Sequence, residues 1–279
     1  QLCAVAEAAY ARVGGELPVY VIGTEVPVPG GATETLNDLA VTTAEHAQAT
    51  IDIHEQIFRA HGLDEAWQRV IALVVQPGVE FDHHKVVDYQ PLNAASLSRM
   101  IDSNPQMVFE AHSTDYQTRI ALHQLVRDHF AILKVGPGVT FALREALWAL
   151  DAIEREWCAE QASGFRDVVV NRLKADPTHW SKHYHGVGAQ LDFDLQYSLS
   201  DRIRYYWPHP EIAAAQAKMF ANLTNDPPPV ALIGQYLPLA YAAVREGHTT
   251  NLPENLVLCH IMATLDDYNA ACTQQRLLN

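Results

Sequence analysis

The stretch FAILKVGPGVTFALREALWALDAIE, residues 130–154, decides the fold class. Its first residues form a short apolar run, which is typical of a strand buried on both faces of a parallel sheet. A tight turn with two glycines follows, and apolar residues then recur at the spacing of an amphipathic helix. The stretch therefore predicts a β-strand that leads directly into an α-helix.

The same strand–turn–helix order occurs three times before this stretch. Strands are predicted in four apolar runs: PVYVIGTE (18–25), RVIALVVQ (69–76), MVFEAH (107–112) and AILKVG (131–136). Helices are predicted over residues 42–61, 93–103, 114–129 and 139–157. Because crossovers of this length suit parallel pairing, the chain is expected to contain four βα units of an α/β fold.

Two architectures can be built from four such units. One is an open, doubly wound sheet, and the other is the C-terminal half of a TIM-type (β/α)8 barrel. The half-barrel is favoured because a missing N-terminal half also explains why the chain opens at Gln1 in what reads as a helix. Something is therefore expected to precede Gln1.

The strand signals stop near residue 160, whereas the helical signals continue to the end of the chain. We therefore assign residues 1–160 to the half-barrel and residues 161–279 to a C-terminal helical appendage. Within the appendage, NDPPP (225–229) is expected to break the chain between two helices, and Pro238 to kink the helix that follows.

Composition excludes several classes of function. The 33 acidic and 19 basic residues give a formal charge of −14, which repels a nucleic-acid backbone. No apolar run reaches the roughly 18 residues of a membrane-spanning helix. The 4 cysteines contain no CxxC pair, so neither a disulfide scaffold nor a structural zinc site is expected, and a reducing cytoplasm is the predicted location.

Candidate catalytic residues lie where the predicted strands end, since barrel enzymes place their reactive groups there. In VFEAH, Glu110 and His112 are two residues apart and point to the same side of the strand. Lys134 ends the next strand, so Glu110 and Lys134 are candidate catalytic residues. His112 suits metal or acid–base chemistry. A hydrogen-bonded polar residue at the barrel mouth is the alternative.

Two glycine loops are candidate phosphate sites. Gly30 and Gly31 follow the first strand in EVPVPGG, and a second loop leads from the fourth strand into a helix. The free N–H groups and dipole of that helix favour an anion at Gly136, Gly138, Val139 and Thr140. An ordinary strand-to-helix turn is the simpler alternative, because a lone glycine loop is a weak signal.

The stretch SLSDRIRYYWPHP (198–210) adds Arg202 and Arg204 as candidate phosphate ligands. A stacked, salt-bridged anchor or a subunit interface explains the same residues. The histidines of DHH (82–84) and HYH (183–185) are interpreted as surface-loop residues, since they lack metal-ligand spacing. No GxxxxGK[ST] loop and no GxGxxG after a strand occurs, which argues against a nucleotide-dependent kinase.

Five stretches together resemble one known family: YVIGTEVPVPGG, VVQPGVEFDH, VFEAHSTDYQT, FAILKVGPGVTFALREALWALDAIE and SLSDRIRYYWPHP. They closely resemble the Z-type subunit of class II D-tagatose-1,6-bisphosphate aldolase, in galactitol and N-acetylgalactosamine catabolism. Members of that family have also been labelled tagatose-6-phosphate kinase. The resemblance implies a non-catalytic subunit that a catalytic class II aldolase subunit needs for full activity and stability. A sugar phosphate as ligand and self-association into a homo-oligomer stay open.

The resemblance also implies a degenerate version of the class II aldolase site. Glu25 with its glycine pair matches one element of that site, and His112 matches a metal-binding histidine. Where another metal-binding histidine is expected, this chain has Gln76 and, a few residues on, Glu80. The metal candidates are therefore Glu25, Glu80 and His112, holding zinc weakly if at all. A ketose-phosphate aldolase in its own right is the alternative function.

Overall fold

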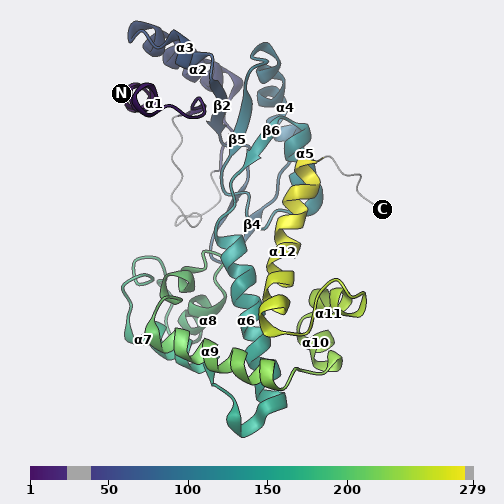
Figure 1. The fold of residues 1–279 in the computed structure, drawn as a ribbon. Helices are drawn as coiled ribbons and strands as arrows, with labels where there is room; N and C mark the ends of the chain where they lie inside the picture. Colours follow the sequence, from purple (N-terminus) through teal and green to yellow (C-terminus); the bar gives the residue numbers. More distant parts are fainter. Residues whose placement is uncertain (24–38, 274–279) are drawn as a thin grey trace. The chain divides into compact units, whose positions relative to one another are not determined.

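The computed structural model describes residues 1–23 and 39–273 (Figure 1). The chain forms two compact units. The sheet unit comprises Gln1–Phe81, Val86–Val135 and the residues from Ala270 onward. The helical unit comprises Asp82–Lys85 and Gly136–Asn269. The predicted domain boundary at residue 160 stays a prediction, while the compact units change at Gly136.

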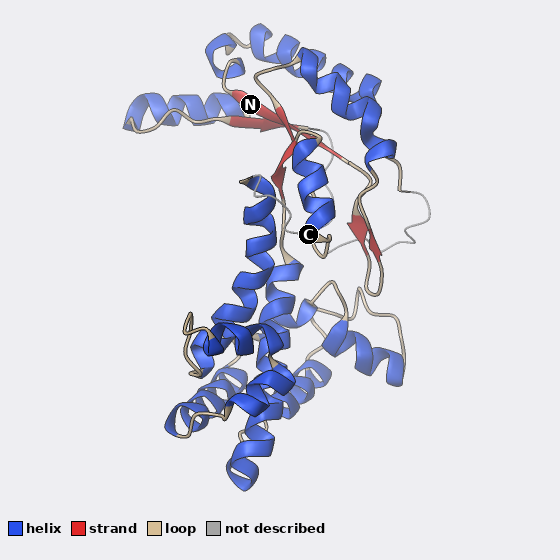
Figure 2. Cartoon of the chain, turned by 90° about the vertical axis from the view of Figure 1, so that its right-hand side faces the viewer, coloured by secondary structure: helices blue, strands red, loops and turns tan. Residues whose placement is uncertain are grey.

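All four predicted strands form in the sheet unit. They are β1 (Tyr20–Ile22), β2 (Val70–Val75), β5 (Val108–Ala111) and β6 (Phe130–Leu133), shown in red in Figure 2. The sheet order is β1-β2-β5-β6 and every pair is parallel. The order in space thus follows the order in the chain, which confirms an α/β fold with a parallel sheet.

Helices join these strands as the βα pattern requires. Helices α2 (Ala44–Ala60) and α3 (Asp64–Trp67) lie between β1 and β2, α4 (Pro91–Met100) with a 3-10 turn at Ile101–Ser103 lies between β2 and β5, and α5 (Arg119–Arg127) lies between β5 and β6. Helix α1 (Leu2–Val13) precedes β1. Helix α2 begins where the Thr43 side chain accepts a hydrogen bond from the His46 N–H, a standard N-cap. The sheet core is apolar, with Leu73 of β2 and Phe109 of β5 almost wholly buried.

A short antiparallel hairpin was not predicted. Its strands are β3 (Glu80–Phe81) and β4 (Val86–Val87), paired Glu80 to Val87 and Phe81 to Val86. Two-residue strands have no measurable periodicity, so the sequence gives no signal for them. The turn of this hairpin, Asp82–Lys85, belongs by its contacts to the helical unit.

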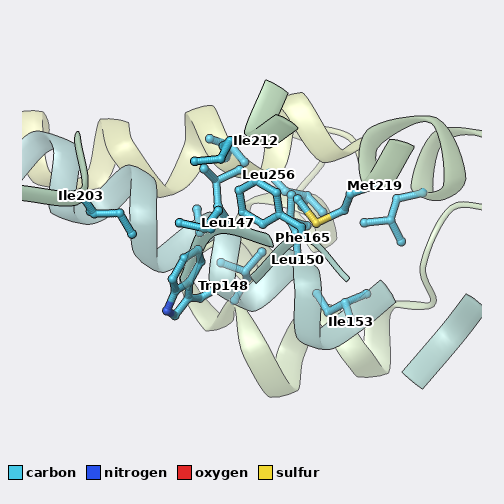
Figure 3. Packing of buried hydrophobic residues seen from close by; sticks show 14 of the residues in the cluster. Leu147, Trp148, Leu150, Ile153, Phe165, Ile203, Ile212, Met219 and Leu256 are labelled. Atoms are coloured by element: carbon cyan, nitrogen blue, oxygen red, sulfur yellow. The ribbon is translucent and has the colours of Figure 1, made fainter. Parts of the chain in front are cut away.

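The helical unit is organised around one long helix, α6 (Pro137–Cys158). The other helices are α7 (Phe165–Ala175), α8 (Ala189–Tyr197), α9 (Pro210–Asn225), α10 (Val230–Tyr236), α11 (Pro238–Arg245) and α12 (Pro253–Cys272), with 3-10 turns at Ala159–Gln161 and Arg202–Tyr206. Figure 3 shows Leu147, Leu150 and Ile153 of α6 packed against Phe165 and Met219. Among the described helices none is long and apolar enough to cross a membrane.

Two helix predictions need correction. Helix α5 begins at Arg119 rather than at residue 114, because Ser113 and Tyr116 adopt positive φ angles of 53° and 63° that no helix allows. Pro238 does not kink a helix but separates two, since α10 ends at Tyr236 and α11 begins at Pro238. A proline fits the first turn of a helix, because the N–H at that position would have no hydrogen-bond partner within the helix.

Candidate functional site

The ends of β5 and β6 bring three predicted residues together in the sheet unit. The Nε2 atom of His112 lies 2.8 Å from Oε1 of Glu110, and Nζ of Lys134 lies 3.4 Å from the same oxygen. The Glu110 side chain is only 7% exposed, whereas that of Lys134 is 53% exposed. One buried carboxylate oxygen is therefore shared by an imidazole and an ammonium group. This arrangement can orient His112 and move a proton, but it commits that oxygen to protein partners.

The backbone around this cluster is fixed by the parallel pairing of the strands. The Lys134 N–H donates to the carbonyl of Ala111 at 2.9 Å, and the Thr114 hydroxyl donates to the Lys134 carbonyl at 2.7 Å. Between them, Ser113 has a φ of 53°, a conformation that residues with a side chain rarely adopt. Such strained residues cluster at functional sites, which marks the loop after β5 as a candidate.

Glu80 lies close to the same loop. It is buried on β3 and accepts a hydrogen bond from the Phe81 N–H at 3.0 Å. Burial raises the pKa of Glu80, and the negative charge of Asp115 raises it further. Hydrogen bonds from Phe81 and Ser113 to the Glu80 carboxylate lower the pKa and partly offset that rise. Glu80 therefore holds its proton more readily than an exposed glutamate does.

At the N-terminus of α6, which was predicted to bind phosphate, the carboxyl group of Asp201 contacts the first turn of the helix. The hydroxyl of Thr140 lies 2.5 Å from Oδ2 of Asp201, and it also lies 3.1 Å from the carbonyl of Pro137. Gly136 is the N-cap and has no side chain that could cap the helix. An acidic group near a helix N-terminus is favoured by the helix dipole, so Asp201 takes a position that suits an anion.

Asp201 was missed as a site residue although it lies in the quoted SLSDRIRYY stretch. Its side chain is almost fully buried and its φ is 45°, in the left-handed region. Burial raises the pKa of Asp201 to about 7, while the Thr140 hydrogen bond and the charges of Arg144 and Arg204 lower it. The carboxyl is therefore partly protonated near neutral pH.

Arg202 and Arg204 belong to the same helical unit, but their bonds go to carbonyl and hydroxyl oxygens. The Nε atom of Arg202 donates to the carbonyl of His179. Nη1 of Arg204 donates to the carbonyls of Ser200 and Asp201, and Nη2 lies 2.9 Å from the Tyr205 hydroxyl. The stacked, salt-bridged anchor expected from the sequence is present in its stacking, since both guanidinium groups lie over the Tyr205 ring, while the hydrogen bonds of these arginines go to neutral oxygens.

The comparisons with known proteins decide the family. The family model described as "GatZ_KbaZ-like: D-tagatose-1,6-bisphosphate aldolase subunit GatZ/KbaZ-like" matches residues 1–273. The chain belongs to this family. The crystal structure of a probable tagatose 6 phosphate kinase from Sinorhizobium meliloti 1021 is similar, with 44% sequence identity and a TM-score of 0.86. The match covers 97% of this chain and 65% of that chain, so this chain spans less than two thirds of the solved one.

The family's aldolase chemistry raises the question of a catalytic metal. In residues 1–23 and 39–273 no group of three His, Cys, Asp or Glu side chains is placed to hold a metal ion. Among the described residues, the carboxylate paired with His112 is that of Glu110, and the ammonium group of Lys134 already lies beside that carboxylate. A catalytic zinc site normally has three protein ligands, so the described residues do not fit one. Glu25, predicted as a ligand, lies outside the described residues, as do Gly30 and Gly31.

The histidines of DHH are not simple surface-loop residues. His83 is half-buried, with Nδ1 at 3.1 Å from the Ser198 hydroxyl and Nε2 at 3.0 Å from the His183 carbonyl. His84 lies 2.6 Å from the buried carboxylate of Asp194. The sequence missed these roles because each partner lies at least 100 residues away along the chain.

Proposed function

We propose that this chain is the accessory subunit that supports the activity and stability of a class II tagatose-bisphosphate aldolase. The observation that carries the proposal is the family match over residues 1–273. The cluster of Glu110, His112 and Lys134 at the strand ends supports it, because the Glu110 carboxylate is paired with His112 and Lys134 rather than available to a metal ion. On this view His112 is a retained ancestral residue. The partner is a catalytic aldolase subunit. Both subunits would act in the reducing cytoplasm, in the catabolism of galactitol or N-acetylgalactosamine.

The test is an aldolase assay on tagatose bisphosphate with added zinc. The full-length protein, a catalytic class II subunit and their mixture are compared for rate and for half-life at a fixed temperature. Activity should come from the catalytic subunit and from the mixture, with a higher rate and a longer half-life in the mixture. If the mixture has the same rate and half-life as the catalytic subunit alone, the accessory role is ruled out.

A ketose-phosphate aldolase in its own right is the second candidate. The strained backbone at Ser113 and Tyr116 beside Glu110, His112 and Lys134 favours it, because such strain is typical of working sites. Chelator-sensitive turnover by the protein alone, abolished in His112→Ala, would establish this function. Turnover that survives the His112→Ala substitution would exclude the cluster as its catalytic site.

A sugar-phosphate kinase is the third candidate, because the similar Sinorhizobium protein is described as a probable tagatose 6 phosphate kinase. An assay of tagatose 6-phosphate with ATP and Mg²⁺ tests it directly. Formation of ADP and a bisphosphate in stoichiometric amounts would support a kinase. No ADP release above the rate without sugar would dismiss it.

Sugar-phosphate binding at Gly136, Gly138, Val139 and Thr140 stays part of the proposal, with Arg202 and Arg204 as further candidates. The helix N-terminus supports it. Asp201 competes with it, since its carboxyl already holds the Thr140 hydroxyl. Calorimetric titration with tagatose 6-phosphate, repeated on Thr140→Val, measures whether this turn binds the phosphate.

We also propose that the four-stranded sheet is one half of a TIM-type barrel. The sheet order follows the chain without a reversal, as it does in a barrel, whereas a doubly wound sheet reverses its order. The solved relative, of which this chain covers 65%, has further length for the other strands. Residues 161–279 would then be the helical appendage of that barrel.

A further inference from the structure

One exposed aromatic ring in the helical unit carries two guanidinium groups. The Cζ atoms of Arg202 and Arg204 lie 5.1 and 4.5 Å from the centroid of the Tyr205 ring. The ring of His179 lies 5.3 Å from the same ring. Tyr205 is 42% exposed, so this stack faces solvent. We call Arg202, Arg204 and Tyr205 the arginine–tyrosine face.

The two arginines are held in place by neutral acceptors. Arg202 donates through Nε to the His179 carbonyl, and Arg204 donates to the carbonyls of Ser200 and Asp201. Within the described residues neither arginine is in an ion pair, whereas six other basic groups of the helical unit are: Arg155, Arg172, Lys174, His84, His248 and His260. Arg204 still interacts with the buried carboxyl of Asp201, whose pKa its charge lowers, whereas Arg202 has no ion pair within the described residues.

Further positive groups gather beside this face. The pKa of Arg202 is lowered by burial, is partly raised again by Tyr205, and is lowered by the charge of Arg204. The pKa of His183 is lowered by burial, and then by the charges of Arg202, His83, His185 and Lys182. Arg202 and Arg204 are therefore close enough to repel each other, in a chain whose formal charge is −14. An incoming anion would relieve this repulsion.

Arg202 has the geometry to receive a carboxylate. Its Nε atom bonds to protein, and neither of its terminal nitrogens is in a hydrogen bond within the described chain. Those two nitrogens form one edge of the planar fork that binds a carboxylate in a bidentate manner. The nearest acid on the same stretch, Asp201, is buried and bonded to Thr140.

We propose that the arginine–tyrosine face docks aspartate or glutamate side chains of the catalytic aldolase subunit. The inference rests on the proposed accessory function and names the surface that would carry it. A protein partner is favoured over a small sugar phosphate, because small ligands bind in concave sites that bury most of their surface. Tyr205 is instead 42% exposed, and arginine and tyrosine are enriched at interface hot spots.

The test measures association of the full-length protein with a purified catalytic subunit. Arg202→Gln is the main variant, because it removes the guanidinium group, with its Nε bond to the His179 carbonyl and its stacking on Tyr205. Arg245→Gln is the control, since Arg245 also stacks on a tyrosine, Tyr241 at 5.7 Å, and donates to its hydroxyl. We expect Arg202→Gln to raise the Kd about ten-fold, and Arg245→Gln to leave it unchanged.

The outcomes separate this inference from the accessory function. No association of the wild-type protein overturns both. Association that Arg202→Gln and Arg245→Gln weaken equally, or not at all, overturns the docking face and leaves the accessory function standing. Normal association of Arg202→Gln with lost binding of tagatose 6-phosphate would also overturn it, in favour of a small anion.

A second measurement covers the case in which Arg202→Gln fails to fold. The Kd of the wild-type complex is then measured between about 50 and about 300 mM NaCl, a range over which surface charge pairs are screened. A Kd that rises steeply with salt agrees with charged docking. A Kd that does not change with salt overturns it.

Discussion

Asp201 shows how one buried side chain can control the pH dependence of this protein. Its carboxyl lies in the helical unit, bonded to Thr140 at the N-terminus of α6. The folded chain raises the pKa of Asp201 to about 7, chiefly by burial. An aspartate in the unfolded chain has a pKa of about 3.9. Between these two values the folded protein binds a proton that the unfolded chain has released.

Asp201→Asn is expected to remove this linkage. For Asp201 the folded pKa is the higher one, so its contribution to stability falls as pH rises from about 4 to about 7 and stays low above that. Asparagine tolerates the left-handed backbone at this position and keeps an oxygen for the Thr140 hydroxyl. Relative to the wild type, the variant should gain up to about 4 kcal/mol on going from pH 4 to pH 8.

Denaturant unfolding across that pH range measures the effect, with Asp192→Asn as the control. The Asp192 side chain is half exposed and pairs with Lys174, so its substitution should not alter the slope in the same way. Equal pH slopes for the wild type and Asp201→Asn would contradict the assignment of the pKa.

At the scale of elements, β1 and β2 approach closely at a glycine. A Cβ atom added to Gly23, just after β1, would lie 2.6 Å from Cβ of Val74 in β2. Cβ atoms of two side chains do not come this near one another. The parallel register at this point, Ile22 opposite Leu73, is therefore compatible only with glycine at position 23.

Gly23→Ala should destabilise the sheet unit by roughly 1–3 kcal/mol, the usual range for overpacking. The measurement is the free energy of unfolding in urea. Val21→Ala is the control on the same strand, because the Val21 side chain is 41% exposed and its truncation leaves no core cavity. A Gly23→Ala protein as stable as Val21→Ala would show that the two strands can separate without cost.

The strands were predicted well from the sequence, because each is a short apolar run in a repeated strand–turn–helix order. The run RVIALVVQ became β2 (Val70–Val75), and the strand-end rule correctly grouped Glu110, His112 and Lys134. Contacts between distant residues could not be predicted. The Thr140–Asp201 bond joins residues 61 apart, and no local pattern marks either partner. The turn at Ser113 was missed because serine, unlike glycine, has no preference for the positive φ that it adopts here.

At the scale of the whole molecule, the chain contains two separately packed cores. Ile153 is wholly buried in the helical unit, within the cluster around α6. Leu73 is 1% exposed in the sheet unit. Each unit thus buries its own apolar side chains, and chains with more than one core often unfold in more than one step.

We therefore expect two unfolding transitions in urea, each sensitive to one core. Ile153→Ala and Leu73→Ala should each cost about 2–5 kcal/mol, but in different transitions. Tryptophan fluorescence separates them, because 4 of the 5 tryptophans, Trp148, Trp157, Trp180 and Trp207, belong to the helical unit. Far-UV circular dichroism follows both units. Ile153→Ala should shift the fluorescence midpoint and Leu73→Ala should leave it in place. One transition that both variants shift equally by both probes would mean that the two cores unfold as one.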